Sequence, residues 1–462
     1  MELREVISRV RGVACDSRKV KPGYVFFAIE GNKVDGNLFI EEAFNRGAIF
    51  AVSEREHPDS RVLKVSDIKS ALASFCSEFY KSPCKELKLI GITGTNGKTT
   101  TTHIVEKILL NAGFQTGLIG TIGYKTSKRT YISSKLTTPD VLTLNRVLNL
   151  MRKDGARWVV MEVSSHALDQ RRIEGCEFFA VGFTNLSRDH LDYHRDMESY
   201  FLAKARLFRD YKYEFALINS DDDYGKRLIN LCKNPISFGK DGDLKILDFK
   251  TDFEGSKIKL GFRGQIFEFY SSLIGDFQAY NIAMGVGFGL LLGIEKDLIE
   301  IALREIKVPG RFETYRGDGF VVVVDYAHTP DALKKLLLSA RKLAKNRLIC
   351  VFGAGGDRDR GKRPLMGDVA SRYCDFCVIT SDNPRSEEPK SIANDIIEGF
   401  RGKHYTMELD RRVAINVAIE LAKEGDVVVV AGKGHEPYQE INGVRYRFKD
   451  SEVVLEALNV RP

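Results

Sequence analysis

The run Leu89–Thr102 constrains the fold more than any other part of the sequence, because an apolar segment leads directly into a glycine-rich turn and then into a helical pattern. Gly94 and Gly97 would let the backbone approach a polyphosphate, and N–H groups of the turn and of the helix start would donate hydrogen bonds to it. Lys98 adds a positive charge, and the Thr99 hydroxyl would hold Mg²⁺. The order of these elements predicts a nucleotide-binding α/β domain.

The loop departs from the strict P-loop pattern at one position. That pattern requires a glycine five residues before Gly97, where this sequence has Ile92. We therefore interpret the loop as a shortened Gly-x-x-Gly-Lys-Thr variant. A glycine-rich turn that binds no ligand is the alternative, and the order of strand, loop, Lys-Thr pair and helix favours nucleotide binding over it.

The central part of the chain alternates between apolar strands and amphipathic helices, which is typical of a parallel sheet covered on both faces. The expected elements are Leu87–Thr93, a helix after Lys98, Thr116–Thr121, Asp140–Arg152, Arg157–Val163 and Phe178–Thr184. Residues 244–270 instead alternate with a period of two and predict antiparallel edge strands, followed by a helix from about Phe277 to Leu292.

Similar patterns occur on both sides of this central part. Near the N-terminus they are the strands Tyr24–Ile29 and Ala48–Val52 and a helix at Asp67–Lys81. After Pro309-Gly310 they are Phe320–Val324, Pro330–Leu343, Leu348–Phe352, Phe376–Thr380 and Val427–Ala431. We therefore predict three α/β domains: a small N-terminal domain at 1–84, a central P-loop ATPase-type domain with a mostly parallel sheet at 85–308, and a third domain at 309–462.

The charge of the chain does not indicate a nucleic-acid partner. There are 70 Lys and Arg residues and 63 Asp and Glu residues, which gives a net charge of +7, and no block of five like charges occurs. A modest basic excess would equally suit phosphorylated or nucleotide-linked small substrates.

The cysteines and the apolar segments point to the cytoplasm. The eight cysteines are scattered, and a chain of this length does not need disulfides to stabilise a core. Cys374 and Cys377 have Cys-x-x-Cys spacing, but no second pair or histidine cluster accompanies them, so we interpret them as buried core residues. No segment reaches 18 consecutive apolar residues, and the N-terminus is too charged for a signal peptide. We expect a cytoplasmic protein that is not inserted in a membrane.

Two polar clusters follow apolar strands. Glu162 comes directly after one strand, and ligands of open α/β sheets bind beyond the carboxyl ends of strands, so we expect Glu162 to lie beside the phosphate loop and bind Mg²⁺. A strand-end charge turned to solvent is the alternative. His190 and His194 lie in a loop after the next strand, where either could bind a metal or position a phosphate, or simply be solvated.

These residues belong to a longer ordered set of motifs, from about residue 14 to about residue 440, that resembles the Mur ligases. The motifs are Asp16-Ser-Arg18, Gly94–Thr99, Glu162–His166, Asn185–His190, Asp325–Pro330, Gly355–Arg358, Asp382–Arg385 and Gly432–Glu436. So many motifs in one order are not expected by chance.

The resemblance is strongest to the Mur ligases that add the third amino acid of the peptidoglycan stem peptide. It implies an N-terminal domain for a UDP-sugar, a central ATPase domain and a C-terminal Rossmann-like domain for the incoming amino acid. It also implies that the D-Glu γ-carboxylate of UDP-MurNAc-L-Ala-D-Glu attacks ATP, and that the acyl phosphate then reacts with the amino group of meso-diaminopimelate. ATP and Mg²⁺ are the implied cofactors, and we expect a monomer.

The resemblance also implies the residues that serve ATP and the metal ions. Lys98, Glu162, His190 and Lys204 would be catalytic, with Lys204 modified to a carbamate and Thr99, Glu162, His190 and Lys204 binding Mg²⁺. ATP would be bound by Gly94, Thr95, Asn96, Gly97, Lys98, Thr99, Thr100, Asn281, Arg311, Asp325 and His328. For Lys204, the alternative is an ordinary exposed lysine on a helix.

The UDP-sugar-peptide would be bound by Cys15, Ser17, Asn32, Lys33, Val34, Thr137, Thr138, Ser164, Gln170 and Arg172, again by resemblance. Threonine and serine at loop ends are also routine helix caps. Pro139 and Asp140 follow Thr138 directly, which keeps a capping role for Thr138 open.

The incoming amino acid would be bound by Arg358, Asp382, Asn383, Pro384, Arg385, Gly432 and Glu436. Arg385 can clamp the distal carboxylate of meso-diaminopimelate, and Glu436 can take the distal ammonium, whereas lysine has only the ammonium. A turn that exposes Arg385 to solvent is the alternative for this motif.

Other functions stay open at this stage. The same ligase chemistry with L-lysine is the nearest one. A folylpolyglutamate synthase fits less well, because Thr137, Thr138 and Asp382–Arg385 match the stem-peptide ligases better. A P-loop ATPase switch would hydrolyse ATP without a carboxylate acceptor, and a non-catalytic sugar-nucleotide-binding protein would not need Lys98, Thr99 and Glu162 together.

Overall fold

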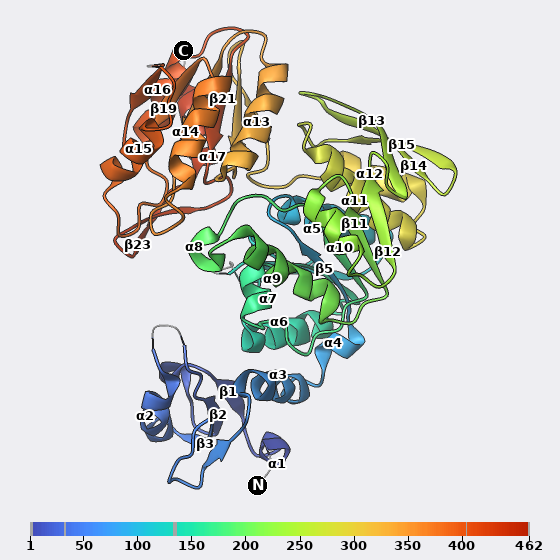
Figure 1. Cartoon of the computed structure of the whole chain (residues 1–462), viewed down its shortest axis with the longest axis vertical. Coiled ribbons are helices and arrows are strands. Elements are labelled where there is room, and N and C mark those ends of the chain that lie inside the picture. The colour runs from blue at the N-terminus through green and yellow to red at the C-terminus, as the bar shows by residue number, and fades with distance from the viewer. Residues whose placement is uncertain (1–2, 32–33, 133–135, 403, 461–462) are drawn as a thin grey trace. The chain divides into compact units, whose positions relative to one another are not determined.

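The computed structural model describes residues 3–31, 34–132, 136–402 and 404–460 (Figure 1). The chain forms two compact units. Unit 1 comprises residues 1–91, 114–181 and 209–214, and unit 2 comprises residues 92–113, 182–208 and 215–462. No helix in the described part of the chain is long and apolar enough to cross a membrane.

The N-terminal part of unit 1 is a parallel sheet with helices on both faces. Its strands are β1 (Gly12–Ala14), β2 (Tyr24–Phe27), β3 (Ala48–Ser53) and β4 (Val62–Lys64), in that order. Its helices are α1 (Leu3–Ile7), α2 (Ile40–Asn45) and α3 (Ile68–Phe79), with short 3-10 turns at Ser17–Lys19 and Gly36–Phe39. Helices α1 and α3 cover one face and α2 covers the other, because the strands carry buried apolar residues on both sides.

The rest of unit 1 carries a second group of strands. They are β5 (Lys88–Thr93), β9 (Trp158–Glu162), β6 (Thr116–Ile119), β7 (Tyr124–Thr126) and β8 (Thr130–Ile132), in that order, and the last two residues of β5 belong to unit 2. The helices are α4 (Pro83–Glu86), α6 (Val141–Lys153) and α7 (Ser165–Asp169). Helix α6 begins after Asp140, whose carboxylate accepts from the Thr143 N–H, so Asp140 and not Thr138 caps this helix.

The first part of unit 2 contains β10 (Ala180–Phe183), whose first two residues belong to unit 1, and β11 (Phe215–Asn219), β12 (Pro235–Gly239), β13 (Leu244–Asp252), β14 (Gly255–Phe262) and β15 (Gln265–Ser271). Strands β13 to β15 are antiparallel, which confirms the expectation for residues 244–270. The helices are α5 (Lys98–Asn111), α8 (Leu191–His194), α9 (Met197–Arg209), α10 (Asp223–Ile229), α11 (Gln278–Leu291) and α12 (Lys296–Glu305). Helix α11 packs closely on α5, because a Cβ on Gly285 would lie 2.3 Å from a methyl carbon of Ile104.

The C-terminal part of unit 2 is a six-stranded sheet in the order β16 (Glu313–Arg316), β17 (Val321–Asp325), β21 (Val427–Ala431), β18 (Leu348–Phe352), β19 (Phe376–Ile379) and β20 (Tyr405–Met407). All pairs are parallel except β16 with β17. A hairpin of β22 (Tyr438–Ile441) and β23 (Val444–Arg447) follows.

Helices cover both faces of this sheet (Figure 1). Helices α13 (Pro330–Leu343), α14 (Lys362–Tyr373) and α15 (Pro389–Ile397) pack on one face. Helices α16 (Arg411–Leu421) and α17 (Asp450–Val460) pack on the other. Cys374 and Cys377 belong to the first core and are 8% and 0% exposed, which confirms that they are buried core residues.

Four neighbouring parallel strands, β17, β21, β18 and β19, end at one edge of this sheet. Each is followed by a loop that contains predicted site residues: Asp325 and His328 after β17, Gly432 and Glu436 after β21, Arg358 after β18, and Asp382–Arg385 after β19. The fold therefore gathers residues that are up to 111 positions apart in the sequence.

A buried ion pair joins the two helices on the second face. The side chains of Arg411 and Asp450 are both 0% exposed, and the Arg411 Nε lies 2.7 Å from the Asp450 Oδ1. Replacing Arg411 with methionine should destabilise the C-terminal part by about 3–5 kcal/mol, because the variant leaves a buried carboxylate without its cation. A urea titration followed by circular dichroism would measure the loss.

The adjacent Arg412 is the matched control. It pairs with Glu456, and both side chains are more than half exposed. Arg412→Met should cost less than about 1 kcal/mol, because solvent screens exposed pairs. Equal urea midpoints for the two variants would contradict a stabilising role for the buried pair.

Candidate active site

The phosphate loop follows β5 and runs from Gly94 to Gly97 in unit 2. Gly94 has a φ of 145° and Gly97 has a φ of 87°, which are values that side chains rarely adopt. A Cβ on Gly94 would lie 1.9 Å from the Thr184 Oγ1, and one on Gly97 would lie 2.3 Å from the Asn281 Oδ1. Both glycines are therefore required by the backbone conformation and by the side chains next to them.

The segment after β10 holds this loop. The Thr95 N–H donates to the Asn185 carbonyl at 2.8 Å, and the Asn96 N–H donates to the Asn185 Oδ1 at 3.0 Å. In return, the Thr184 hydroxyl donates to the Asn96 carbonyl at 2.6 Å. The Thr95 hydroxyl also lies 3.1 Å from the Tyr200 hydroxyl. These contacts shape the loop from within the protein.

Two lysines converge on the first carbonyl of the loop. The Lys98 Nζ donates to the carbonyls of Gly94 at 2.9 Å and Thr95 at 2.8 Å. The Lys204 Nζ donates to the same Gly94 carbonyl at 2.8 Å. A polyphosphate bound by this loop would therefore meet an amine from each end of unit 2's loop scaffold, α5 and α9.

Lys204 is buried within α9. It is 1% exposed, so the alternative of an exposed helix lysine is wrong. Its Nζ also lies 4.8 Å from the centre of the Tyr200 ring. Burial and, next, the positive charge of Lys98 lower the pKa of the Lys204 amine well below its usual value. A neutral amine at physiological pH is the form that reacts with CO₂ to give a carbamate.

His190 lies beside a buried carboxylate. Its φ of 56° turns the chain before α8, and its Nε2 lies 3.4 Å from the Asp189 Oδ2. Burial opposes ionisation of Asp189, but the charges of His190, Lys362 and His328 hold its pKa below the usual range. Asp189 is the acidic neighbour that sequence analysis did not select, although it stands directly before His190.

Several residues expected to bind ATP meet at the start of α5. The Arg311 Nη2 donates to the Thr99 Oγ1 at 3.2 Å, and the Thr101 hydroxyl donates to the Asn281 Oδ1 at 3.4 Å. The Arg311 guanidinium also lies 4.5 Å from the centre of the Tyr326 ring. Thr100 is buried in the same helix turn. The structure thus brings Asn281 and Arg311 to the phosphate loop.

Asp325 and His328 lie in the loop after β17. The Asp325 carboxylate accepts from the N–H groups of Phe312 and Ala327, both at 2.8 Å, so it organises two backbone segments. Burial raises the pKa of Asp325. The His328 Nδ1 lies 2.9 Å from the Tyr326 carbonyl, and burial and the charge of Lys362 lower the pKa of its ring.

In unit 1, Thr138 is the centre of the group expected to bind the sugar peptide. Its side chain is fully buried, and its hydroxyl donates to the Glu162 carbonyl at 2.8 Å and accepts from the Ser164 N–H at 2.9 Å. The Arg172 Nη1 donates to the Thr138 carbonyl at 3.1 Å. Gln170 accepts from the same guanidinium at 2.7 Å. Ser164 caps α7, which confirms the capping alternative for that residue.

The Glu162 carboxylate is tied to the loop after β6. It accepts from the Thr121 N–H at 2.8 Å and from the Thr121 hydroxyl at 3.0 Å. The Thr121 hydroxyl also lies 3.1 Å from the Thr137 hydroxyl. Glu162 is 1% exposed, so the alternative of a strand-end charge turned to solvent is wrong.

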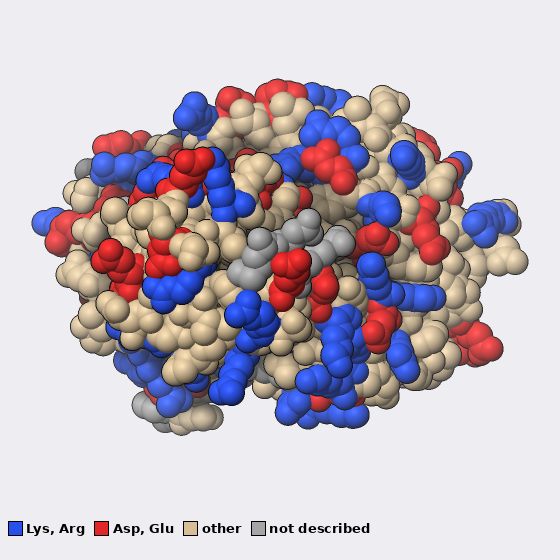
Figure 2. Space-filling model, turned by 90° about the horizontal axis from the view of Figure 1, so that it is seen from below, with Lys and Arg blue, Asp and Glu red and all other residues tan. Residues whose placement is uncertain are grey.

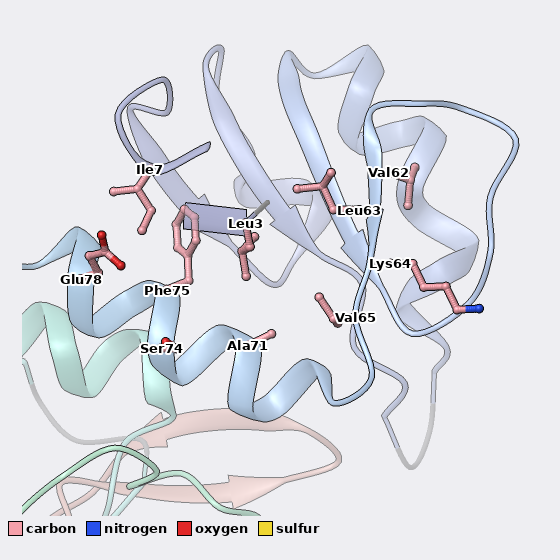
Figure 3. A pocket seen from close by; sticks show the side chains of 10 residues that line it. All are labelled: Leu3, Ile7, Val62, Leu63, Lys64, Val65, Ala71, Ser74, Phe75 and Glu78. Atoms are coloured by element: carbon pink, nitrogen blue, oxygen red, sulfur yellow. The ribbon is translucent and has the colours of Figure 1, made fainter. Parts of the chain in front are cut away.

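The other residues expected near the sugar nucleotide are less connected. The buried Ser17 donates from its hydroxyl to the Glu42 Oε2 at 2.9 Å, whereas Cys15 and Val34 are exposed. Asn32 and Lys33 lie outside the described residues. An open cavity of about 540 Å³ lies elsewhere in unit 1, between α1, β4 and α3, and is lined by none of the residues expected to bind a substrate (Figure 3).

Two loops at the edge of the C-terminal sheet interlock. The Gly356 N–H donates to the Asn383 carbonyl at 2.9 Å, and the Arg385 Nη1 donates to the Gly356 carbonyl at 2.6 Å. The Ser386 hydroxyl donates to Asp357 at 2.6 Å. Arg385 is half-buried, so the alternative of a turn that exposes it to solvent is wrong. Arg358, in contrast, is exposed and donates to the Asp357 carbonyl at 3.2 Å.

A buried lysine completes this edge, and sequence analysis did not select it. The Lys433 Nζ lies 3.1 Å from the Glu436 Oε2 and 3.8 Å from the Asp382 Oδ1. Burial opposes ionisation of Asp382, but Lys433 and Arg411 hold its pKa below the usual range. Gly432 is required here, because its φ is 117° and a Cβ would lie 2.6 Å from the Asp382 Oδ2.

The residues expected to bind Mg²⁺ come from both units, Glu162 from unit 1 and Thr99, His190 and Lys204 from unit 2. No group of three or more His, Cys, Asp or Glu side chains in the described ranges forms a ready metal cage. Mg²⁺ is usually bound by one or two protein groups together with substrate phosphates, and a hydroxyl such as Thr99 suits that mode. The low pKa of Lys204 would allow the oxygen ligand that an amine alone lacks. The donor set therefore fits Mg²⁺.

Three family models match the chain. They are described as "Mur ligase family, catalytic domain" at residues 9–80, "Mur ligase middle domain" at residues 92–289 and "Mur ligase, glutamate ligase domain" at residues 310–434. Together they span most of the sequence.

Known proteins agree with these models. A relative from Aquifex aeolicus (strain VF5), named UDP-N-acetylmuramoyl-L-alanyl-D-glutamate--2,6-diaminopimelate ligase, is 53% identical and covers 99% of this chain and 95% of its own. A solved structure with the same name is 35% identical, with a TM-score of 0.71 over 97% of this chain and 95% of that one. The MurF ligase from Thermotoga maritima, solved with ADP, is 20% identical and shares the fold, with a TM-score of 0.68 over 99% and 98%.

Proposed function

Because the chain belongs to the Mur ligase family, we propose that it joins meso-diaminopimelate to the D-Glu γ-carboxylate of UDP-MurNAc-L-Ala-D-Glu in an ATP-dependent reaction. The observation that carries the choice of amino acid is the interlocked pair of loops beyond β18 and β19. They place the cation Arg385 and, through Asn383, the anion Glu436 in one cluster. A distal centre with both a carboxylate and an ammonium matches this pair.

The proposed chemistry has two steps. The D-Glu γ-carboxylate attacks the γ-phosphorus of ATP, which gives an acyl phosphate and ADP. The free amino group of the diamino acid then attacks the acyl carbon, which forms the amide and releases phosphate. A carboxylate is a poor electrophile until it is phosphorylated, so the site has to stabilise the charge of phosphoryl transfer before the amide forms.

The residues of unit 2 would supply that stabilisation. Lys98 would turn from the loop carbonyls to the phosphates, and the N–H groups at the start of α5 would donate to them. Mg²⁺, when bound, would neutralise part of the phosphate charge. Thr99 and a carbamylated Lys204 would hold the metal ions together with His190 and Glu162.

We propose that this work is divided among three domains. Residues 1–84 would bind the UDP-sugar with Ser17 and its neighbours, and residues 85–308 would bind ATP. Residues 309–462 would bind the amino acid. We further propose that the protein is a cytoplasmic monomer, which light scattering would test.

The test is phosphate release from ATP in the presence of UDP-MurNAc-L-Ala-D-Glu, with meso-diaminopimelate, L-lysine, D-lysine, L-ornithine or buffer added in separate reactions. Release should require both the sugar peptide and meso-diaminopimelate. Release with L-lysine instead would keep the ligase and change its amino acid. Release without the sugar peptide would point to an ATPase switch. Against a polynucleotide-binding ATPase, Figure 2 shows acidic and basic side chains interspersed over the visible face.

Arg385 gives a sharper form of this test. Replacing it with alanine should lower kcat/KM for meso-diaminopimelate by about 100-fold, because a distal carboxylate would lose a charged, two-pronged donor. Arg447→Ala is the matched control, since that side chain lies on the nearby hairpin and is 85% exposed. An Arg385→Ala variant with unchanged selectivity between meso-diaminopimelate and L-lysine would contradict the assignment.

A further inference from the structure

Lys433 is the most deeply buried cation at the edge of the C-terminal sheet. It follows β21, and its side chain is 0% exposed. None of the residues expected to bind ATP or the amino acid includes it. A buried ammonium is costly unless anions and hydrogen-bond acceptors surround it, so its partners indicate what it is there to do.

Those partners are residues expected to bind the incoming amino acid. The Lys433 Nζ donates to the Asn383 Oδ1 and to the Glu436 Oε2, both at 3.1 Å. The Asn383 Nδ2 donates to the same Glu436 Oε2 at 2.9 Å. One oxygen of Glu436 is thus fixed by two donors. The Oε1 accepts no hydrogen bond from the residues that the structure describes, and the side chain is 18% exposed.

The charges of this cluster leave one negative charge unmatched. Lys433 offsets one of the two carboxylates of Asp382 and Glu436, which it approaches to 3.8 Å and 3.1 Å. The nearby Arg411 is paired with Asp450 and so does not change this balance. One cation from a ligand would complete it.

We propose that Lys433 is a positioning residue that fixes Glu436 and Asn383 for the distal ammonium of the incoming diamino acid, and so helps to determine specificity. The proposal rests on the proposed function and deepens it. Without Lys433, Glu436 would lose one of its two fixed donors and would face Asp382 with no cation between them. The distal ammonium would then be held less well, whereas a distal carboxylate bound by Arg385 would be little affected.

The test compares two ligands that differ only at the distal ammonium. Lys433→Met keeps much of the volume and removes the charge. We expect its KM for meso-diaminopimelate to rise by about 10- to 100-fold with kcat within about threefold of wild type. The inhibition constant of 2-aminopimelate, which has the distal carboxylate but no distal ammonium, should change less than about twofold. Lys334→Met, an exposed lysine on α13, is the control.

Each other outcome overturns a definite statement. An unchanged KM for meso-diaminopimelate, or an equal loss for both ligands, would overturn the positioning role while the wild type remains active. A wild type without meso-diaminopimelate-dependent phosphate release would overturn the proposed function itself. If Lys433→Met does not fold, Lys433→Met/Glu436→Gln removes the uncompensated carboxylate as well. That double variant should fold and should bind meso-diaminopimelate no better than Glu436→Gln alone, and a further loss would overturn action through Glu436.

Discussion

Replacing Lys98 with alanine should lower the rate of phosphate release by about 10²- to 10³-fold at saturating substrates. The Lys98 amine already lies over the phosphate loop, 2.9 Å and 2.8 Å from the carbonyls of Gly94 and Thr95. An ATP phosphate would offer it a full negative charge in place of two carbonyl dipoles. The charge that develops during transfer would therefore lose its nearest mobile cation.

Lys107→Ala is the matched control for this prediction. It lies on the same helix, α5, but pairs with Glu305 at 2.7 Å, away from the loop. The control should keep its activity within about twofold, because a surface pair contributes little. Equal losses in the two variants would mean that substitutions damage α5, and full activity in Lys98→Ala would exclude a direct role for the amine.

Lys204→Met should lower kcat by a similar factor, about 10²- to 10³-fold. The reaction of the neutral amine with CO₂ forms an N–C bond and releases a proton, and it converts a cation into an anion with two oxygens. Burial favours the neutral amine: the pKa of Lys204 is lowered, so the uncharged form that reacts is present at neutral pH, where an exposed lysine is an ammonium. Lys204→Arg cannot form the carbamate and should be equally inactive.

The carbamate itself can be observed. Protein equilibrated with ¹³C-bicarbonate should show a carbamate carbon signal that is absent in Lys204→Met, and wild-type activity should fall in CO₂-depleted buffer and return with bicarbonate. Lys212→Met, whose side chain is 82% exposed, should keep both the signal and the activity. Full activity with no carbamate signal would exclude the modification and leave Lys204 as a buried amine.

The regular elements were predictable because their patterns are long and uniform. The helix expected at Pro330–Leu343 has those bounds in the structure, and so does the strand expected at Val427–Ala431. Both combine a clear period with a marked start, a proline at the first helical position in one and five apolar residues in the other. Strand β11 was not identified, because its apolar run Phe215–Ile218 is too short to distinguish from a helix turn.

Burial of polar residues was harder to predict than secondary structure. Lys204 is flanked at spacings of four by Tyr200 and Phe208, which are both buried, so the helical period did place it on an apolar face. That signal was available and was outweighed by the usual exposure of lysine. For Lys433 no such signal exists, because its neighbours Asp382 and Asn383 come from a different strand end and meet it only through the sheet topology.

The interlock of the loops at 355–358 and 382–387 has a consequence for exchanging amino-acid specificity between relatives. Each loop supplies hydrogen bonds to the other, and a Cβ on Gly356 would lie 1.9 Å from the Pro384 carbonyl. A segment transplanted into one loop would therefore meet a partner shaped for the old sequence. Recipient and donor loops have to be exchanged as a pair, so an altered substrate preference is reached by one coordinated replacement and not by single substitutions accumulated in the 382–385 motif.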